Sequence, residues 1–432
     1  MATTERGPTR AARTQRTREA IVDAAREAFV TRGYRATSLR DVAAAAGISH
    51  TGLLRHFATK DALLGAVVDQ FERGNATALR GVPGLDESGT LGYAGIARRN
   101  QEQPGYLELF AALTGEASNP RHPAHPLMRD RYARVRREAR EDLDAAIAHG
   151  TVAAGRDAAG EAIRIIAAWD GLQLLAQYLP ERVDIPTALV EYLKTLALPV
   201  GWRVGGRESA PPRQPARVPT SPAFGADDVS PQGYRVGRER RALIIEAATA
   251  LFAREGYGDT SLREIAERVG VSKSTLLHHF ASKEELLSDV LHHRDQQIES
   301  RDDGVRADSA AEVVRGIARR AAVNSEAAPG LIEVYAVLSC EAVPRDHAAH
   351  SYFAQRFRDG LDHFAALFRA AHEDGDLPAQ RDPEFEALWL TALWDGLQYQ
   401  WLYDPSAVDV AAQLSAHLDD VLPGSLANRR GG

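Results

Sequence analysis

A 23-residue segment of this chain occurs twice, and this repeat limits the fold more than any other feature. Residues 38–60 and 261–283 align without a gap at an offset of 223 residues. Each copy places apolar residues at helical spacing on both sides of a turn that holds Gly47 or Gly270, the pattern of helix, turn and helix. Glycine at such a turn adopts a left-handed backbone conformation at little cost. The 432 residues are therefore expected to contain two copies of one helical domain.

The ends of these helices are also marked. A first helix is predicted from Thr17 to Arg32, because its apolar residues recur on one face. Ser38 lies three residues before Asp41, and Ser261 lies three residues before Glu264, so each pair predicts a capping box at the second helix. The first pair is expected to be the weaker, since aspartate is shorter than glutamate.

A third helix is predicted to begin after Ser49 and Ser272, both good N-cap residues. Short polar or basic side chains occupy its exposed early positions, where a recognition helix contacts base edges. These candidates are His50, Thr51, Gly52, Lys273, Ser274 and Thr275. Candidates for phosphate contact are His56, Lys60, His279 and Lys283.

The charge distribution favours DNA as the partner. Residues 1–60 hold 11 Lys and Arg against 5 Asp and Glu, and residues 231–283 hold 9 against 6, although the whole chain carries a net charge of -7. Small basic domains attached to acidic bodies are typical of nucleic-acid-binding proteins. Helix-turn-helix geometry also occurs in proteins that never touch DNA, so a protein-binding or architectural module without sequence reading remains the alternative.

Both segments resemble the DNA-binding domain of the TetR (tetracycline-repressor-like) family of bacterial regulators. The pattern in the first copy is Ala25, Phe29, Gly33, Tyr34, Thr37, Ser38, Leu39, Val42, Ala43, Gly47, Ile48, Ser49, Leu53, His56, Phe57 and Lys60, and it recurs from Ala248 to Lys283. The family commonly has two tyrosines before the histidine, where this chain has Leu54 and Arg55, then Leu277 and His278. Arg55 could replace the missing phosphate contact, and His278 is the matching candidate in the second copy.

The rest of each copy is predicted to be helical, and it is duplicated at an offset of 225 residues. Residues 169–173 and 394–398 share the sequence Trp-Asp-Gly-Leu-Gln. The resemblance implies that residues 161–198 and 384–421 pair in a four-helix bundle, with Gly171 and Gly396 allowing close helix approach. A helix that is merely internal to each body is the alternative.

The resemblance also implies a small-molecule effector held among the body helices. The candidates are Tyr106, Phe110, Trp169, Gln173, Tyr335, Trp394 and Gln398. Aromatic residues at this spacing are also typical of plain core. His122 and His125 share a helical spacing that can hold a metal, but prolines interrupt the pair, so capping and loop packing are favoured. No metal or other cofactor is expected, and the absence of nucleotide-binding and nucleophile-elbow motifs argues against an enzyme.

The predicted organisation is all-α, with two tandem units. It comprises a flexible basic arm (1–16), a helix-turn-helix domain (17–62), a body (63–200), a Pro/Gly-rich linker (201–235), a second helix-turn-helix domain (236–285) and a second body (286–425). With no long apolar run, no signal-like N-terminus and one cysteine, Cys340, no membrane span and a cytoplasmic location are expected.

These features together predict a transcriptional regulator, and a repressor in particular. Its operator would be double-stranded DNA, and a small-molecule effector would release it. The two units are predicted to pair with each other within one chain, with a homodimer of chains as the other possible assembly.

Overall fold

The computed structural model describes residues 9–34, 36–79, 91–203, 218–219, 235–299, 307–327 and 329–423. These residues form eighteen α-helices and contain no strand, which confirms the all-α prediction. We call residues 9–203 unit 1 and residues 235–423 unit 2. The helices of unit 1 are α1 (Arg10–Arg32), α2 (Leu39–Ala45), α3 (His50–Leu54), α4 (Lys60–Leu79), α5 (Tyr93–Glu102), α6 (Tyr106–Glu116), α7 (His125–His149), α8 (Ala158–Tyr178) and α9 (Ile185–Leu196).

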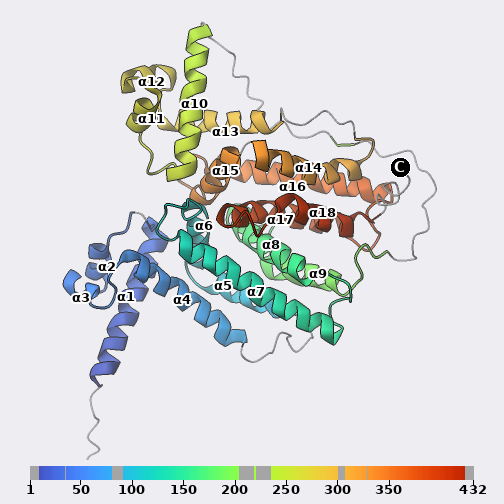
Figure 1. Cartoon of the computed structure of the whole chain (residues 1–432), viewed down its shortest axis with the longest axis horizontal. Helices are drawn as coiled ribbons and strands as arrows, with labels where there is room; N and C mark the ends of the chain where they lie inside the picture. The colour runs from blue at the N-terminus through green and yellow to red at the C-terminus, as the bar shows by residue number, and fades with distance from the viewer. Residues whose placement is uncertain are drawn as a thin grey trace, which may run out of the picture.

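Unit 2 repeats this order. Its helices are α10 (Arg235–Glu255), α11 (Leu262–Val269), α12 (Lys273–His279), α13 (Lys283–Glu299), α14 (Ala310–Ala327), α15 (Pro329–Glu341), α16 (His350–Glu373), α17 (Pro383–Tyr403) and α18 (Val410–Val421). In each unit the first three helices form the helix-turn-helix domain, and the remaining six form the body. Figure 1 shows the two helix-turn-helix domains at the same end of the molecule, with both bodies beside them.

Local sequence signals account for the helix-turn-helix domains. The capping boxes at Ser38 and Ser261 are both complete. The Ser38 amide donates to Asp41 at 2.9 Å, and the Ser261 amide donates to Glu264 at 3.1 Å, so the box forms at Asp41 as well as at Glu264. The backbone brings the shorter carboxylate close enough. Gly47 and Gly270 have φ angles of 68° and 73°, the left-handed conformation expected at the turn.

The first helix begins earlier than predicted. α1 starts at Arg10, because the Thr9 hydroxyl accepts from the Ala12 amide and caps the helix. Gln15 also donates to Glu19 one turn later. Residues 10–16 therefore belong to a helix rather than to a flexible arm, and residues 1–8 of the predicted arm lie outside the described residues.

The two bodies meet along α8 and α17, which pack against each other over much of their length. Gly171 on α8 lies against Ala392, and Gly396 on α17 lies against Ala167. A Cβ atom at either glycine would overlap the carbonyl oxygen of the facing alanine. The absence of a side chain at these two positions allows the two helix backbones to touch.

Hydrogen bonds join the bodies on both sides of this contact. The Tyr178 hydroxyl donates to the Ser339 carbonyl at 2.6 Å, and the Tyr403 hydroxyl donates to the Leu113 carbonyl at 2.9 Å. Tyr178 and Tyr403 occupy matching positions in the two copies. The contacts between the units are thus approximately reciprocal.

The predicted linker, residues 201–235, lies mostly outside the described residues. Its first residues pack against unit 2: the Gly201 amide donates to Asp420 at 2.7 Å, and Arg203 donates to the carbonyls of Gly375 and Asp376. The first residues of the predicted linker are therefore held against unit 2. None of the helices in the described ranges is long and apolar enough to cross a bilayer.

Candidate DNA-binding surfaces and ligand pockets

The predicted recognition helices are α3 and α12. The hydroxyls of Ser49 and Ser272 cap them by accepting from the amides of Gly52 and Thr275, each at 3.0 Å. Among the predicted base-contacting residues, Thr51, Lys273 and Ser274 are exposed, whereas His50, Gly52 and Thr275 are half-buried. One exposed face of each short helix therefore carries the candidate side chains.

Cations fix each recognition helix to its domain. Arg18 lies over the Phe57 ring at 4.2 Å and donates to the His56 carbonyl. Arg241, the matching residue of unit 2, lies over the Phe280 ring at 4.3 Å. A cation over an aromatic face contributes about 0.5–1 kcal/mol at such partly exposed sites.

The candidates for phosphate contact occupy different environments. Arg55 and His278 are exposed, and His56 and His279 are half-buried. The ammonium groups of Lys60 and Lys283 lie 4.2 Å from the ring centres of Tyr34 and Tyr257, which follow the first helix of each unit. Lys283 also donates to the Tyr257 carbonyl. A phosphate contact by Lys283 therefore requires its ammonium group to exchange or share this partner.

Two apolar residues that the sequence argument left out lie on the same surfaces. Leu54 and Leu277 are each 40% exposed, and they occupy matching positions at the recognition helices. Apolar side chains in the major groove contact the methyl group of thymine. Both leucines stand where the family commonly has a tyrosine, and this difference could have identified them as candidate base-contacting residues.

Each helix-turn-helix domain is joined to its body at the glycine that ends its first helix. In unit 2 the Glu341 carboxylate, at the end of α15, accepts from the amides of Tyr257 and Gly258 at 2.6 and 2.5 Å. Tyr257 also packs edge-on against His347. In unit 1, Tyr34 makes the equivalent ring contact with His122. A displacement of α15 would therefore be transmitted to the second helix-turn-helix domain through these hydrogen bonds.

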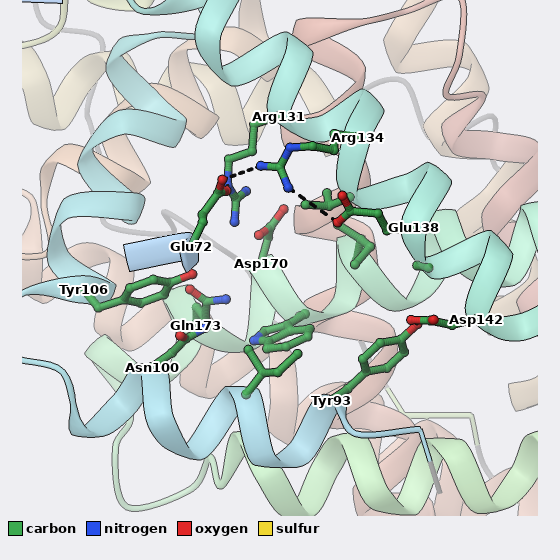
Figure 2. A pocket seen from close by; sticks show the side chains of 15 residues that line it. Glu72, Tyr93, Asn100, Tyr106, Arg131, Arg134, Glu138, Asp142, Asp170 and Gln173 are labelled. Atoms are coloured by element: carbon green, nitrogen blue, oxygen red, sulfur yellow. Dashed lines mark hydrogen bonds and ion pairs between the residues drawn. The ribbon is translucent and has the colours of Figure 1, made fainter. Parts of the chain in front are cut away.

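A cavity of about 300 Å³ lies in the body of unit 1, between α5, α7 and α8. Glu72 accepts from Arg131 at 2.8 Å and also pairs with Arg134. Asp170 points from α8 toward these two arginines, and Asn100 enters from α5 (Figure 2). The wall is completed by aromatic and apolar side chains: Tyr93, Ile96, Tyr106, Val135, Ala139, Ile166 and Trp169.

A second cavity of about 240 Å³ occupies the matching place in unit 2. Arg356, Trp394, Asp395 and Gln398 line it at the positions that Arg131, Trp169, Asp170 and Gln173 hold in unit 1. Asp295 replaces Glu72 and accepts from Arg356 at 2.8 Å. The duplication has therefore kept a pocket with an arginine and a buried carboxylate in both units.

Six of the seven predicted effector residues line these cavities. Tyr106, Trp169 and Gln173 face the first, and Tyr335, Trp394 and Gln398 face the second. Phe110 does not line a cavity: its ring packs on Tyr106 at 4.4 Å and lies under Arg131 at 4.5 Å. Arg131, Asp170 and their partners were not among the predicted site residues, although both residues recur at the offset of 225.

Two buried carboxylic acids, Asp170 in the first pocket and Asp395 in the second, have raised pKa values. Burial raises the pKa of Asp170 to about 6, although Arg131 opposes the shift. Burial raises the pKa of Asp395 to about 7, against the effect of Arg356 and Arg294. Each group can therefore change its charge near neutral pH, which is unusual for an aspartate.

Asp395→Asn is expected to stabilise the chain at about pH 8 and to change little at about pH 4. The pKa of Asp395 is about 7 in the folded chain, far above its value of about 4 in the unfolded chain. Between these two pH values the folded state binds a proton that the unfolded state has released. The free energy of unfolding of the wild type therefore falls as pH rises from about 4 to about 7. The amide avoids this cost, which is on the order of 4 kcal/mol when fully developed.

Thermal unfolding of both chains across this pH range tests the prediction. Asp130→Asn, at a side chain that is 70% exposed, is the control and should change stability by less than about 0.5 kcal/mol. An equal effect of Asp395→Asn at both pH values would contradict an ionisation cost.

The side chains of His122 and His125 form hydrogen bonds with nearby backbone groups. The His122 ring nitrogen Nδ1 accepts from the Ala124 amide at 3.2 Å, and His125 Nδ1 lies 2.9 Å from the Ala117 carbonyl. Both contacts recur at His347 and His350. Within the described part of the chain, no cluster of His, Cys, Asp and Glu is arranged to hold a metal ion.

Comparison with known proteins agrees with this architecture. The model of the bacterial regulatory proteins of the tetR family matches residues 21–67 and 244–290. The model of the C-terminal domain of BetI-type transcriptional repressors matches residues 95–197 and 310–423. Together these matches cover well over half of the chain, and both occur twice. The chain belongs to the TetR family of bacterial regulators.

Individual relatives match one unit at a time. The HTH-type transcriptional regulator TtgR of Pseudomonas putida is 28% identical over 199 residues, which is 42% of this chain and 89% of TtgR. The HTH-type transcriptional repressor KstR2 of Mycobacterium tuberculosis is 44% identical over 52 residues, 12% of this chain and 26% of KstR2. Among solved structures, SmeT, the repressor of the Stenotrophomonas maltophilia efflux pump SmeDEF, is 24% identical, with 41% of this chain and 86% of SmeT covered and a TM-score of 0.34.

The class of the protein follows from the family. It is a helix-turn-helix DNA-binding transcriptional regulator composed of two tandem TetR-like units. TetR-family regulators are DNA-binding proteins rather than enzymes, and they bind DNA operators and small-molecule effectors.

Proposed function

We propose that this protein is a cytoplasmic repressor in which the two units pair within one chain and both helix-turn-helix domains bind one operator. Effectors bound in the two body pockets release it from DNA. The reciprocal packing of α8 and α17 carries this proposal. In a twofold homodimer, residue i of one protomer contacts residue j of its partner, and j of the first contacts i of the second. The contacts of Gly171 with Ala392 and of Gly396 with Ala167 reproduce that reciprocal relation within a single chain.

The position of the helix-turn-helix domains supports a shared operator. Both lie at one end of the paired bodies (Figure 1), so both recognition helices can approach one duplex. The candidate base-contacting residues of α3 and α12 differ at matching positions: Thr51 corresponds to Ser274, and His50 corresponds to Lys273. Two unlike half-sites are therefore expected, in contrast to the palindromes that symmetric dimers bind.

The route from pocket to DNA would run through α6 and α15. Tyr335 lines the pocket of unit 2 from α15, and Glu341 near the end of the same helix holds the amides of Tyr257 and Gly258. Tyr106 stands at the start of α6 in unit 1, which ends at Glu116. A ligand that prefers a shifted position of these helices would change the separation of the two domains and lower the affinity for DNA.

Lys273→Ala is expected to change base preference at one half-site and to leave the other unchanged. The Lys273 side chain is exposed at the first position of α12, where a base contact is worth about 1–3 kcal/mol of discrimination. His50→Ala is the matched variant for the other half-site. Binding of each variant to a library of operators randomised in one half at a time measures the effect. Equal loss on all sequences would assign Lys273 to phosphate instead.

A footprint of the purified chain on the DNA upstream of its own gene tests the proposed function. Two unlike protected half-sites about one helical turn apart are expected. A symmetric palindrome would contradict pairing between the two different domains. Binding no stronger than to random DNA would favour a helix-turn-helix module that does not read sequence.

A further inference from the structure

The two pockets are equivalent in position but differ in charge. The first is lined by four carboxylates and two arginines: Glu72, Glu138, Asp142, Asp170, Arg131 and Arg134. The second is lined by three arginines and two carboxylates: Arg294, Arg320, Arg356, Asp295 and Asp395. Acidic groups are therefore in surplus in unit 1, and basic groups are in surplus in unit 2.

Substitutions since the duplication produced this difference. Glu138 and Asp142 of unit 1 correspond to His363 and Leu367 of unit 2, so two carboxylates have no counterpart there. Phe71 of unit 1 corresponds to Arg294, so this pocket arginine is present only in unit 2. Burial lowers the pKa of His363 below its usual value, which leaves that ring neutral near pH 7.

Within the first pocket, the arginines already have a partner. Glu72 accepts from Arg131 and also pairs with Arg134. Three buried polar atoms of the lining make no hydrogen bond among the described residues: the acceptors Asp170 Oδ2 and Asn100 Oδ1, and the donor Trp169 Nε1. Buried polar atoms without a partner are costly, so a ligand that donates hydrogen bonds would be stabilised here.

Within the second pocket, the Asp295 carboxylate already accepts several hydrogen bonds from the protein. Asp295 accepts from Arg294 at 3.0 Å, from Arg356 at 2.8 Å and from the Tyr352 hydroxyl at 2.6 Å. Arg294 is 7% exposed, and its Nε has no hydrogen-bond partner among the described residues. The unsatisfied group in this pocket is therefore a cationic donor, whereas the unsatisfied charged group in the first pocket is the Asp170 carboxylate.

We propose that the two pockets select effectors of opposite charge, so that the chain responds to two chemical classes of signal. The unit 1 pocket takes an organic cation with an apolar or aromatic body, which donates to Asp170 and lies among the rings of Tyr93, Tyr106 and Trp169. The unit 2 pocket takes an organic anion, whose carboxylate or similar group accepts from Arg294. This inference rests on the proposed function, in which both pockets hold effectors.

A matched pair of probes tests the proposal: 2-phenylethylammonium and 3-phenylpropanoate, which share a ring and spacer but carry opposite charges. Calorimetric titration of the full chain should show one site for each. Asp170→Asn should weaken the cation about tenfold, the loss expected for one charge-assisted hydrogen bond, and leave the anion unchanged. Arg294→Gln should weaken the anion by a similar factor and leave the cation unchanged.

A second variant, with substitutions at less buried positions, checks that a loss of cation binding does not result from misfolding. Glu138→His combined with Asp142→Leu gives unit 1 the residues of unit 2 at positions where one side chain is 52% exposed and the other is half-buried. It should also weaken the cation and spare the anion. The proposal is overturned if both probes occupy one pocket, if either variant weakens both probes equally, or if neither probe binds at millimolar concentration.

Operator binding, measured separately with each probe, distinguishes this inference from the proposed function. Charge-selective binding without any change in DNA affinity would support the pocket assignment and contradict effector release. Release of DNA by both probes through a single pocket would support effector control and contradict the opposite selectivity.

Discussion

Gly396→Ala is expected to destabilise the chain by about 3 kcal/mol or more, the upper end of the cost of overpacking a well-packed core. The added methyl group would overlap the carbonyl oxygen of Ala167 on the facing helix. This atom is backbone in the middle of α8, so no side chain can rotate away to relieve the overlap. The two helices must separate, and the aligned contacts along both of them weaken together.

The loss should extend to DNA binding. The two helix-turn-helix domains are held at a common end by the paired bodies (Figure 1), so separation of α8 from α17 would relax their spacing. Affinity for an operator with two half-sites should fall by at least about tenfold, which corresponds to only 1.4 kcal/mol. Thermal unfolding and titration with operator DNA measure the two effects, and Gly171→Ala should reproduce both.

Gly65→Ala is the matched control. Gly65 lies within α4, and an added Cβ there meets no atom within 4 Å. Alanine at an open helical position should stabilise the chain by about 0.5–1 kcal/mol. If Gly396→Ala behaved like this control, the helices would not be in the close contact described.

The helix-turn-helix domains were predicted well, because their signals are local. The Ser38 and Ser261 caps, and the glycines at the two turns, act within a few residues of their place in the sequence. The start of α1 was predicted seven residues late, since the apolar pattern begins after the helix does. Its true start depends on the Thr9 cap, which hydrophobic periodicity does not report.

The pockets were predicted only in part. Aromatic residues at helical spacing pointed to the correct helices, but spacing alone does not separate a pocket wall from the core beneath it, as Phe110 illustrates. Tyr106 lies one turn before Phe110, and its side chain reaches the cavity while the phenyl ring packs below it. The pairing of Glu72 with Arg131 spans 59 residues, so it depends on tertiary packing that no local pattern encodes.

The contact between the units contains a buried charge cluster that the sequence argument also missed. Asp420 on α18 accepts from Arg156 of unit 1 at 3.2 Å and from Arg381 of unit 2 at 3.0 Å. All three side chains are at most 8% exposed. Arg156 and Arg381 occupy matching positions, but the counterpart of Asp420 in unit 1 is Thr195. Arg156 also pairs with Glu161 at 3.0 Å, and Arg381 also pairs with Glu386 at 2.8 Å. Asp420 is thus the carboxylate that the two arginines share, and two copies of unit 1 alone would lack it.

Asp420→Asn is expected to destabilise the chain by about 3 kcal/mol at neutral pH, because it removes one negative charge from a buried cluster. Each guanidinium group keeps its second partner, Glu161 or Glu386, so the lower end of the usual cost of breaking a buried pair applies. Burial alone would raise the pKa of Asp420, but Arg381 and Arg156 together lower it below its usual value. The stabilisation is therefore present above the unfolded pKa and is lost as pH falls through the folded one, so the stabilities of wild type and variant should begin to converge only below about pH 4.

Two further variants separate pairing between the units from simple loss of a charge. Asp419→Asn changes the adjacent residue, whose partner Arg315 belongs to the same unit; with a side chain 31% exposed, it should cost about 1 kcal/mol or less. Thr195→Asp added to Asp420→Asn restores a carboxylate at the matching place in unit 1, next to Arg156, which donates to the Thr195 carbonyl at 2.9 Å. Recovery of much of the lost stability is expected, since reciprocal packing brings that position toward Arg381 as well. A double variant no more stable than Asp420→Asn would mean that the cluster depends on the geometry of α18 alone, and that the two units are not related there by the pairing we propose.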